Sequence, residues 1–316
     1  MLKNRVLIFL VILSCLFLSG CRQNVNHLVK EKPNKPVDIQ NNNNDSAKNG
    51  DNSQNEPEAS TPEPTPDPSV EPKPSPKPAL EPTYAHYDNT KYSWYFNRRS
   101  DHLPPTTGAK LNELAGKYNA IYLGDTSRKV VYLTFDEGYE NGYTPKILDI
   151  LKKNNVKAAF FITMPYLKNQ YKLVERMTNE GHIVGNHTVS HPSLPEILDD
   201  QKLKNEIEEL SKAYKEKTGK EMKYLRPPKG EFSERTLKMS SDLGYRNIFW
   251  SFAYADWDVT NQKGADYAHK MVMDNVHNGG VFLLHAVSKS NTEALDRIIR
   301  DLKAQGYSFE TLDEIM

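Results

Sequence analysis

Beyond Val130 the chain alternates short runs of β-branched and aromatic residues with stretches in which apolar residues recur at helical spacing. This alternation is typical of parallel strands that are joined by helices. Seven such units favour an α/β fold built as a distorted or incomplete (β/α) barrel, although an open doubly wound sheet has the same periodicity. The predicted strands are Val130–Phe135, Ala158–Thr163, His182–Gly185, Tyr224–Arg226, Asn247–Phe252, Gly280–Leu284 and Tyr307–Glu310.

Six amphipathic stretches are predicted to be helices. The first begins with Thr144 as N-cap and Pro145 at the first helical position, which favours helix initiation. Gly181 and Gly219 are expected to end the next two helices. No Gly-x-Gly-x-x-Gly motif follows the first strand, which argues against dinucleotide binding. The predicted helices are Pro145–Lys153, Tyr171–Glu180, Asp200–Lys217, Ser233–Leu243, Ala265–His277 and Asn291–Gln305.

The first 21 residues have the layout of an export signal. Lys3 and Arg5 precede an apolar run at Val6–Leu18, which is shorter than the roughly 20 apolar residues of a transmembrane helix. The tetrapeptide Leu18-Ser19-Gly20-Cys21 resembles a bacterial lipobox. We therefore expect residues 1–21 to be a lipoprotein signal peptide, and the protein to be exported and lipid-anchored through Cys21 to the outer face of the cytoplasmic membrane. The alternative is an ordinary cleaved signal with a chance cysteine.

Residues 22–83 are predicted to form a disordered tether that is rich in asparagine and proline. Ten prolines lie between Pro57 and Pro82, and aliphatic clusters are almost absent, so the segment cannot bury enough apolar surface to fold. Residues 84–316 form one domain by length. Within it, we expect residues 84–128 to cover the barrel rather than to form a wall of a groove.

Composition narrows the choice of partners. The formal net charge is zero over 316 residues, whereas a nucleic-acid partner would call for a basic excess. The only two cysteines, Cys15 and Cys21, lie in or beside the export signal, so the folded part has no disulfide. No protein partner is predicted.

Polar residues follow the predicted strands at their carboxyl ends, where parallel α/β proteins gather functional groups. Each has a structural alternative, because a carboxylate can cap a turn and a histidine can be a core residue. His187 and His191 have the spacing with which two imidazoles can face one ion, but Pro192 disfavours helix at His191. The residues at the strand ends are Asp136, Glu137, His187, Arg226, Asp256 and His285.

In this order the groups resemble the motifs of the polysaccharide deacetylase family, also called the NodB-homology family or carbohydrate esterase family 4. The family carries Thr-Phe-Asp-Asp-Gly, His-x-x-x-His, Arg-x-Pro-x-Gly, Asp-Trp and Leu-Leu-His. The segments Gly138–Pro145 and Arg226–Glu234 look most like the branch of delta-lactam-biosynthetic de-N-acetylases. The resemblance spans roughly Tyr92 to Met316, and its motifs stand at Thr134–Gly138, His187–His191, Arg226–Gly230, Asp256–Trp257 and Leu283–His285.

The resemblance implies a metal-dependent amide hydrolase, in which a divalent cation activates water and polarises the acetyl oxygen. The implied metal ligands are His187, His191 and Glu137. Zinc is the leading candidate, and cobalt, nickel, manganese and iron also suit such ligands. Glu137 departs from the family, which usually has aspartate there, and from the branch, which often has asparagine. The implied catalytic residues are Asp136 as general base, His285 as general acid, Asp256 as the partner of His285 and Arg226 as the partner of Asp136.

The resemblance also implies a substrate. We expect removal of N-acetyl groups from N-acetylmuramic acid in peptidoglycan glycan strands, a step towards muramic delta-lactam in spore cortex. The alternatives are a deacetylase of N-acetylglucosamine polymers or acetylated xylan, and a non-catalytic cell-wall-binding lipoprotein. Leu283 would line the pocket for the acetyl methyl group, and the Lys229 amide would help to hold the oxyanion. The implied substrate contacts are Gly138, Tyr139, Asn141, Lys229, Trp257 and Leu283.

Overall fold

The structure is a computed structural model that describes residues 83–315. The predicted signal peptide, the predicted lipidation site Cys21 and the predicted tether up to residue 82 lie outside the described residues. Among residues 83–315, no helix combines the length and the apolar composition that are needed to cross a membrane.

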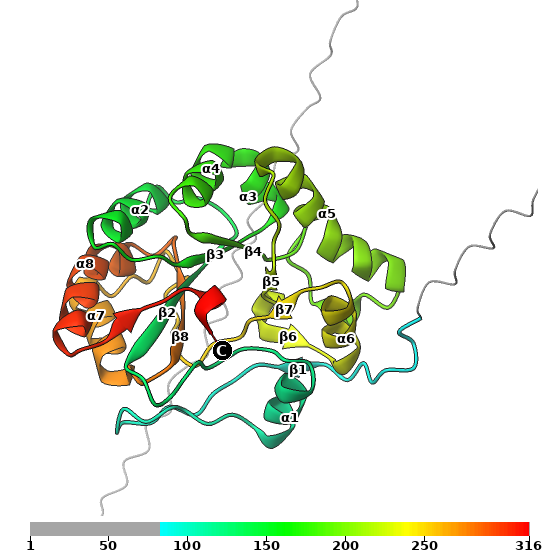
Figure 1. The fold of residues 1–316 in the computed structure, drawn as a ribbon, viewed down its shortest axis with the longest axis horizontal. Helices are drawn as coiled ribbons and strands as arrows, with labels where there is room; N and C mark the ends of the chain where they lie inside the picture. Colours follow the sequence, from blue (N-terminus) through cyan, green and yellow to red (C-terminus); the bar gives the residue numbers. More distant parts are fainter. Residues whose placement is uncertain (1–82, 316) are drawn as a thin grey trace, which may run out of the picture. The chain divides into compact units, whose positions relative to one another are not determined.

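Seven strands form a curled parallel sheet that makes a half-barrel with helices on its outer face (Figure 1). The strand order is β7-β5-β4-β3-β2-β8, and β9 pairs with β2. The prediction of an α/β fold with a distorted, incomplete (β/α) barrel of seven parallel strands is therefore confirmed. The strands are β2 (Val130–Glu137), β3 (Ala159–Ile162), β4 (Ile183–Asn186), β5 (Tyr224–Leu225), β7 (Arg246–Asn247), β8 (Gly280–His285) and β9 (Ser308–Phe309).

The strand predicted at Asn247–Phe252 is much shorter in the structure. Only Arg246–Asn247 pairs with β5 as β7, and beyond it the chain touches the sheet at single residues. Ile248 donates its amide to Leu225 of β5, whereas Phe252 forms an isolated parallel bridge with Phe282 of β8. The segment thus crosses from one edge of the half-barrel towards the other, and it has no continuous neighbour with which to form a ladder.

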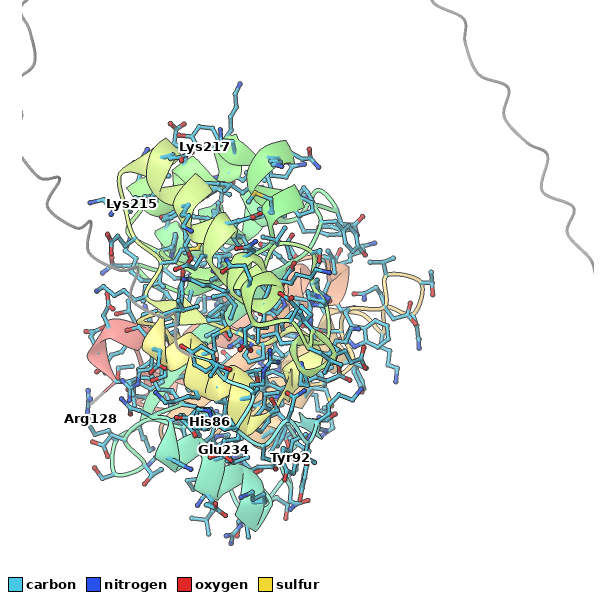
Figure 2. All side chains as sticks on the ribbon, turned by 90° about the vertical axis from the view of Figure 1, so that its right-hand side faces the viewer. His86, Tyr92, Arg128, Lys215, Lys217 and Glu234 are labelled. Atoms are coloured by element: carbon cyan, nitrogen blue, oxygen red, sulfur yellow. The ribbon has the colours of Figure 1, made fainter. Side chains whose placement is uncertain are left out.

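All six predicted helices are present and pack around the outside of the sheet (Figure 1). Two α-helices were not predicted, α1 (Ala109–Lys117) before the sheet and the short α3. Thr144 is the first residue of its helix and not the N-cap, which is Tyr143. Lys215 and Lys217 lie in the last turn of α5, where cations complement the helix dipole (Figure 2). The helices are α2 (Thr144–Lys153), α3 (Met164–Asn169), α4 (Tyr171–Asn179), α5 (Asp200–Thr218), α6 (Glu234–Asp242), α7 (Ala265–Asn275) and α8 (Lys289–Ala304).

The segment before β2 packs on the side of the barrel near α6. Its strand β1 (Tyr92–Ser93) pairs antiparallel with β6 (Glu231–Phe232), and its helix α1 (Ala109–Lys117) contributes to an apolar cluster around Trp94. The Trp94 ring stacks on Phe249 with centroids 4.4 Å apart. The segment therefore covers the barrel, as expected.

Strand β2 is buried on both faces, and its side chains alternate between two environments. Tyr132 belongs to the apolar cluster inside the barrel, whereas Leu133 and Phe135 belong to the cluster between sheet and helices. By the same alternation, Asp136 faces the inside of the barrel and Glu137 faces the helices. The two adjacent carboxylates therefore belong to different layers of the fold.

A glycine in β4 lets an aromatic ring fill the barrel interior. A Cβ atom at Gly185 would lie 2.6 Å from the ring of Phe161 on β3. That ring is fully buried, and its centroid lies 4.2 Å from the guanidinium carbon of Arg226. The close approach of β4 to Phe161 thus fixes the wall against which Arg226 packs.

We predict that Gly185→Ala destabilises the protein by about 1–3 kcal/mol, because the added methyl group overpacks the interior at Phe161. Chemical denaturation measures this change in the free energy of unfolding. The matched control is Gly116→Ala in α1, where a Cβ atom meets no atom within 4 Å and helix propensity predicts a gain of about 0.5–1 kcal/mol. Equal effects of the two substitutions would contradict the packing argument.

Candidate active site

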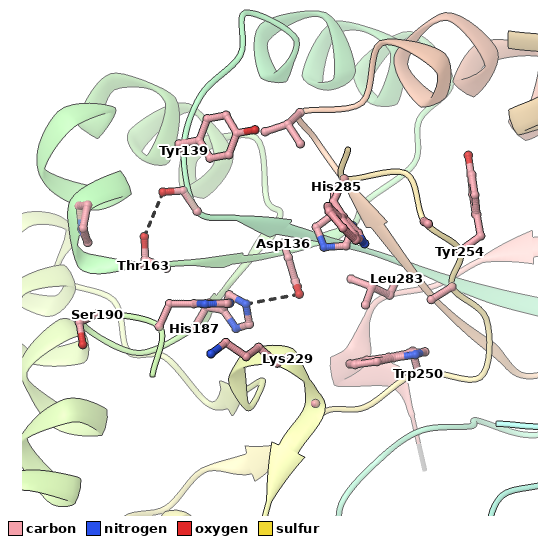
Figure 3. Close-up of a pocket in the computed structure, with 18 of the residues that line it drawn as sticks. Asp136, Tyr139, Thr163, His187, Ser190, Lys229, Trp250, Tyr254, Leu283 and His285 are labelled. Atoms are coloured by element: carbon pink, nitrogen blue, oxygen red, sulfur yellow. Dashed lines mark hydrogen bonds and ion pairs between the residues drawn. The ribbon is translucent and has the colours of Figure 1, made fainter. Parts of the chain in front are cut away.

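A pocket of about 900 Å³ opens at the carboxyl ends of the strands (Figure 3). Its lining brings together side chains from β2, the loop after β4, the turn before β6 and β8. Arg226 and Asp256 lie behind this lining and contact it. The predicted site residues that line the pocket are Asp136, Gly138, Tyr139, His187, His191, Lys229, Trp257, Leu283 and His285.

Arg226 organises the floor of the pocket and is fully buried. Its Nη1 donates to Asp136 Oδ1 at 2.7 Å, and its Nη2 donates to Thr134 Oγ1 at 2.7 Å. Burial alone would raise the pKa of Asp136, but the charge of Arg226, with smaller contributions from the neighbouring His187 and His285, lowers it below its usual value. Asp136 is therefore a carboxylate that stays ionised although it is buried. Thr134, the second side-chain partner of Arg226, was not predicted from the sequence.

His187 is oriented by the backbone of Arg226. Its Nδ1 lies 2.8 Å from the Arg226 carbonyl oxygen, which can only accept, so Nδ1 carries the proton and donates. The other nitrogen, Nε2, then has a free lone pair and lies 3.4 Å from Asp136 Oδ2 (Figure 3). Burial lowers the pKa of His187 to about 4. This neutral, fixed imidazole has the form that a metal ligand requires.

His191 lies beside His187, with the two ring centroids 4.7 Å apart. The connecting turn is not helical, because Thr188 and His191 both have left-handed backbone angles, φ 72° and φ 61°. The Thr188 hydroxyl accepts a hydrogen bond from the His191 amide at 3.1 Å and closes this turn. The histidine pair is thus brought together by a strained loop and not by one face of a helix.

The pair fits two positions of a metal site. Among residues 83–315, however, no group of three or more His, Cys, Asp or Glu side chains forms a complete set of ligands. The carboxylate nearest to the pair is Asp136, whose Oδ2 lies 3.4 Å from His187 Nε2. Catalytic metal sites commonly leave positions to water or substrate, so the pocket suits an open site with His187 and His191 as ligands.

The prediction that Glu137 is the third ligand is wrong for this structure. Glu137 is fully buried on the opposite face of β2 and does not line the pocket. Its Oε1 accepts a hydrogen bond from the Thr144 hydroxyl at 3.3 Å, and its Oε2 has no partner. Burial raises the pKa of Glu137 well above its usual value, with a smaller contribution from Glu140. Neighbouring side chains in a strand point to opposite faces, so the residue after Asp136 faces away from the pocket. The orientation of the strand, and not the greater length of glutamate relative to aspartate, therefore keeps Glu137 from the metal site.

Across the pocket from His187, Asp256 holds His285. His285 Nδ1 lies 2.7 Å from Asp256 Oδ1, and the His285 amide donates to Asp256 Oδ2 at 2.8 Å. Burial would lower the pKa of His285, but the hydrogen bond and the charge of Asp256 raise it above its usual value. Asn291 also donates to Asp256 Oδ2. Asn291 was not predicted, because its position in the first turn of α8 looks like that of an ordinary helix residue.

Aromatic side chains flank the pocket. Tyr139 and Trp257 are 54% and 58% exposed, so their ring faces are available to a sugar. Trp250 and Tyr254 also line the pocket and were not predicted. The prediction that Asn141 contacts the substrate needs correction, because Asn141 does not line the pocket.

The Asn141 side-chain amide donates to the Val287 carbonyl at 3.0 Å, and Val287 does line the pocket. Asn141 therefore fastens the loop after β2 to the loop after β8. It does not contact the space that a substrate would fill.

The residues from 123 to 248 match the model of the polysaccharide deacetylase family. The chain belongs to this family, because it is also 48% identical over 229 residues to the peptidoglycan-N-acetylmuramic acid deacetylase PdaA of Bacillus subtilis, a match that covers 72% of this chain and 87% of that protein. The solved structure of PdaA, a family 4 carbohydrate esterase, superposes with a TM-score of 0.71 at 47% identity and covers 72% of this chain and 98% of that chain.

Two further relatives are similar to this chain over most of their length. An uncharacterized 30.6 kDa protein of Geobacillus stearothermophilus is 53% identical over 235 residues, which are 74% of this chain and 88% of that protein. A peptidoglycan-N-acetylglucosamine deacetylase of Bacillus cereus is 36% identical over 200 residues, which are 62% of this chain and 71% of that protein. The family thus includes relatives that are named for two different sugars.

We predict that Asp256→Asn lowers the pKa of His285, because asparagine keeps the size of the side chain and removes the charge that favours the imidazolium. NMR titration of the imidazole ring measures the change. His182, whose pKa burial lowers to about 4, lies at the other end of the sheet and serves as the internal control. An unchanged His285 pKa in the variant would show that Asp256 does not raise the pKa of His285.

Proposed function

We propose that this protein is a metal-dependent hydrolase that removes the N-acetyl group from N-acetylmuramic acid residues in peptidoglycan glycan strands. The observation that carries this proposal is one pocket in which an ionised Asp136 and a His285 with a raised pKa are held by separate buried partners. Amide hydrolysis needs such a pair, one group to accept a proton and one to donate it. The 48% identity with a relative named for this substrate supports the choice of sugar.

In this proposal Asp136 is the general base, and it accepts a proton from the attacking water. Arg226 keeps Asp136 ionised and aimed through the 2.7 Å hydrogen bond to Oδ1. His285 is the general acid and donates a proton to the departing amine nitrogen. Asp256 favours the imidazolium form and fixes the ring through Nδ1, which leaves Nε2 to face the pocket. Each such proton transfer typically accelerates a reaction about 10²-fold to 10⁴-fold.

His187 and His191 would hold the divalent metal. When bound there, the metal would lower the pKa of water and polarise the acetyl oxygen. The structure supports a need for this chemistry, because a carboxylate whose pKa is lowered is a weak base towards ordinary water. Zinc is our first choice, and cobalt, nickel, manganese and iron also suit a site of two imidazoles with open positions.

Other pocket residues would bind the sugar. Leu283 is apolar and nearly buried in the pocket wall, which suits the acetyl methyl group. Tyr139 and Trp257 would stack on sugar rings along the groove. The backbone amide of Lys229 would hold the oxyanion of the acetyl group.

The cellular setting rests on the sequence alone. We propose that residues 1–21 direct export, that Cys21 carries the lipid anchor and that residues 22–83 tether the enzyme within the cell wall. Deacetylation of muramic acid would then be a step towards muramic delta-lactam in spore cortex.

A second candidate is a deacetylase of N-acetylglucosamine polymers, which the 36% identity with the Bacillus cereus enzyme favours. Acetylated xylan is a further alternative substrate of the same chemistry. A non-catalytic cell-wall-binding lipoprotein is disfavoured, because neither Asp136 nor His285 is missing and both are held in place.

We predict that the wild-type protein releases acetate from peptidoglycan glycan strands faster than from chitooligosaccharides. Asp136→Asn should reduce this rate about 10²-fold to 10⁴-fold and leave glycan binding largely intact. Acetate release and mass spectrometry of the muramic acid residues measure both effects. The matched control is Asp149→Asn on the exposed face of α2. A preference for chitooligosaccharides would favour N-acetylglucosamine as the substrate sugar. If no acetate is released from peptidoglycan, chitooligosaccharides or acetylated xylan with metal supplied, the non-catalytic binding protein is the remaining candidate.

We predict that His187→Ala weakens Zn²⁺ binding by roughly 10-fold or more, since loss of a ligand should exceed the loss of an outer-shell partner. Isothermal titration calorimetry on the metal-free protein measures this directly. The control is His86→Ala, an exposed histidine outside the pocket. Equal zinc affinity in wild type and His187→Ala would exclude His187 as a ligand.

A further inference from the structure

Three of the ionisable side chains that line the pocket have hydrogen-bond partners, whereas the ammonium group of Lys229 has none among residues 83–315. Asp136 pairs with Arg226, His187 with a backbone carbonyl, and His285 with Asp256. In the part of the chain that the structure describes, no hydrogen bond or ion pair is formed by the ammonium group of Lys229. This cation lies on the pocket wall with no anion to neutralise it.

Nearby anions do not supply the missing partner. The charge of Lys229 contributes to lowering the pKa of Glu196, after the larger effect of Lys91. The Glu196 carboxylate, however, accepts its hydrogen bond from Lys91 Nζ at 2.8 Å. Asp136 is paired with Arg226 on the pocket floor. Arg226 itself is fully buried, so its charge is not exposed to a bound molecule. Lys229 is therefore the cation in the pocket lining that is available to a bound molecule.

The backbone at Lys229 is costly for a lysine. Its φ is 59°, in the left-handed region that asparagine and glycine adopt most readily. Gly230 follows with φ 67°, and a Cβ atom there would lie 2.8 Å from Trp250. The tight turn thus directs the Lys229 side chain along the pocket wall near His187 (Figure 3). Strain of this kind at a pocket is a reason to look for a function of the side chain.

We propose that the Lys229 ammonium binds the lactyl carboxylate of muramic acid and thereby selects muramic acid residues that carry no stem peptide. This inference rests on the proposed function. Muramic acid differs from glucosamine by a lactyl ether on C3, next to the acetamido group on C2. The backbone amide of Lys229 is proposed to face the acetyl oxygen of the C2 substituent. The side chain of the same residue is therefore well placed to reach the lactyl group on C3. A stem peptide converts the carboxylate into an uncharged amide and removes this interaction.

The test compares two substrates that differ only in this charge. One is peptide-free glycan strands with free lactyl carboxylates, and the other is the same strands after methyl esterification. We expect the wild type to prefer the free acid by roughly 10-fold in kcat/KM, mainly through KM, as for a charge-assisted hydrogen bond that forms with the bound substrate. The preference should shrink at high salt, because the ammonium group is exposed to solvent.

Three variants locate the interaction. Lys229→Met should bring the ratio of kcat/KM for acid and ester close to one, and Lys229→Arg should restore a preference for the acid. Lys168→Met removes the same charge from an exposed position of α3 outside the pocket and should keep the wild-type ratio. All variants keep a backbone amide at residue 229, so the oxyanion contact is not removed.

The outcomes separate this inference from the proposed function. A wild-type ratio near one, or a ratio that Lys229→Met leaves unchanged, would overturn the role of Lys229 even if muramic acid is deacetylated. An enzyme that acts on neither muramic substrate but does act on chitooligosaccharides would overturn the proposed function instead. Thermal unfolding of each variant identifies a change in the ratio that comes from misfolding.

Discussion

The buried ion pair between Arg226 and Asp136 is the interaction on which the rest of the site depends. Burying two charges is costly unless each is fully hydrogen-bonded, and here the guanidinium also reaches Thr134 and the Ile248 carbonyl. The same residue orients His187 through its own carbonyl oxygen. One arginine therefore fixes both the proposed general base Asp136 and the proposed metal ligand His187, and a change in its position would disturb both.

The barrel provides this arrangement because its strands end at one edge. Phe161 and the close approach at Gly185 support Arg226 from one side, while Leu283 and His285 on β8 form the other wall. The half-barrel is open between β7 and β8, and the segment around Phe252 crosses this gap without a ladder. The pocket lies on the face where functional loops of such folds usually converge.

The sequence predicted the fold class and most of the pocket, because hydrophobic periodicity and strand-end chemistry are local signals. Asp136, His187 and His285 follow apolar runs, and their convergence requires only that parallel strands share one edge. The assignment of Glu137 failed for a reason that is also local, since neighbouring side chains in a strand face opposite layers. A stricter use of this alternation would have placed Glu137 among the helices. Thr134, Asn291 and the turn at His191 depend on tertiary contacts that no spacing in the sequence reveals.

The site depends on Arg226 to keep Asp136 ionised although it is buried. Carbon-13 NMR titration of the Asp136 side-chain carboxyl group in the metal-free protein tests it most directly. This carboxyl group is expected to titrate below the ordinary aspartate value of about 3.9, because the charge of Arg226 favours its ionised form. A midpoint at or above that value would mean that the effect of burial outweighs the charge of Arg226, and that Arg226 does not keep Asp136 ionised.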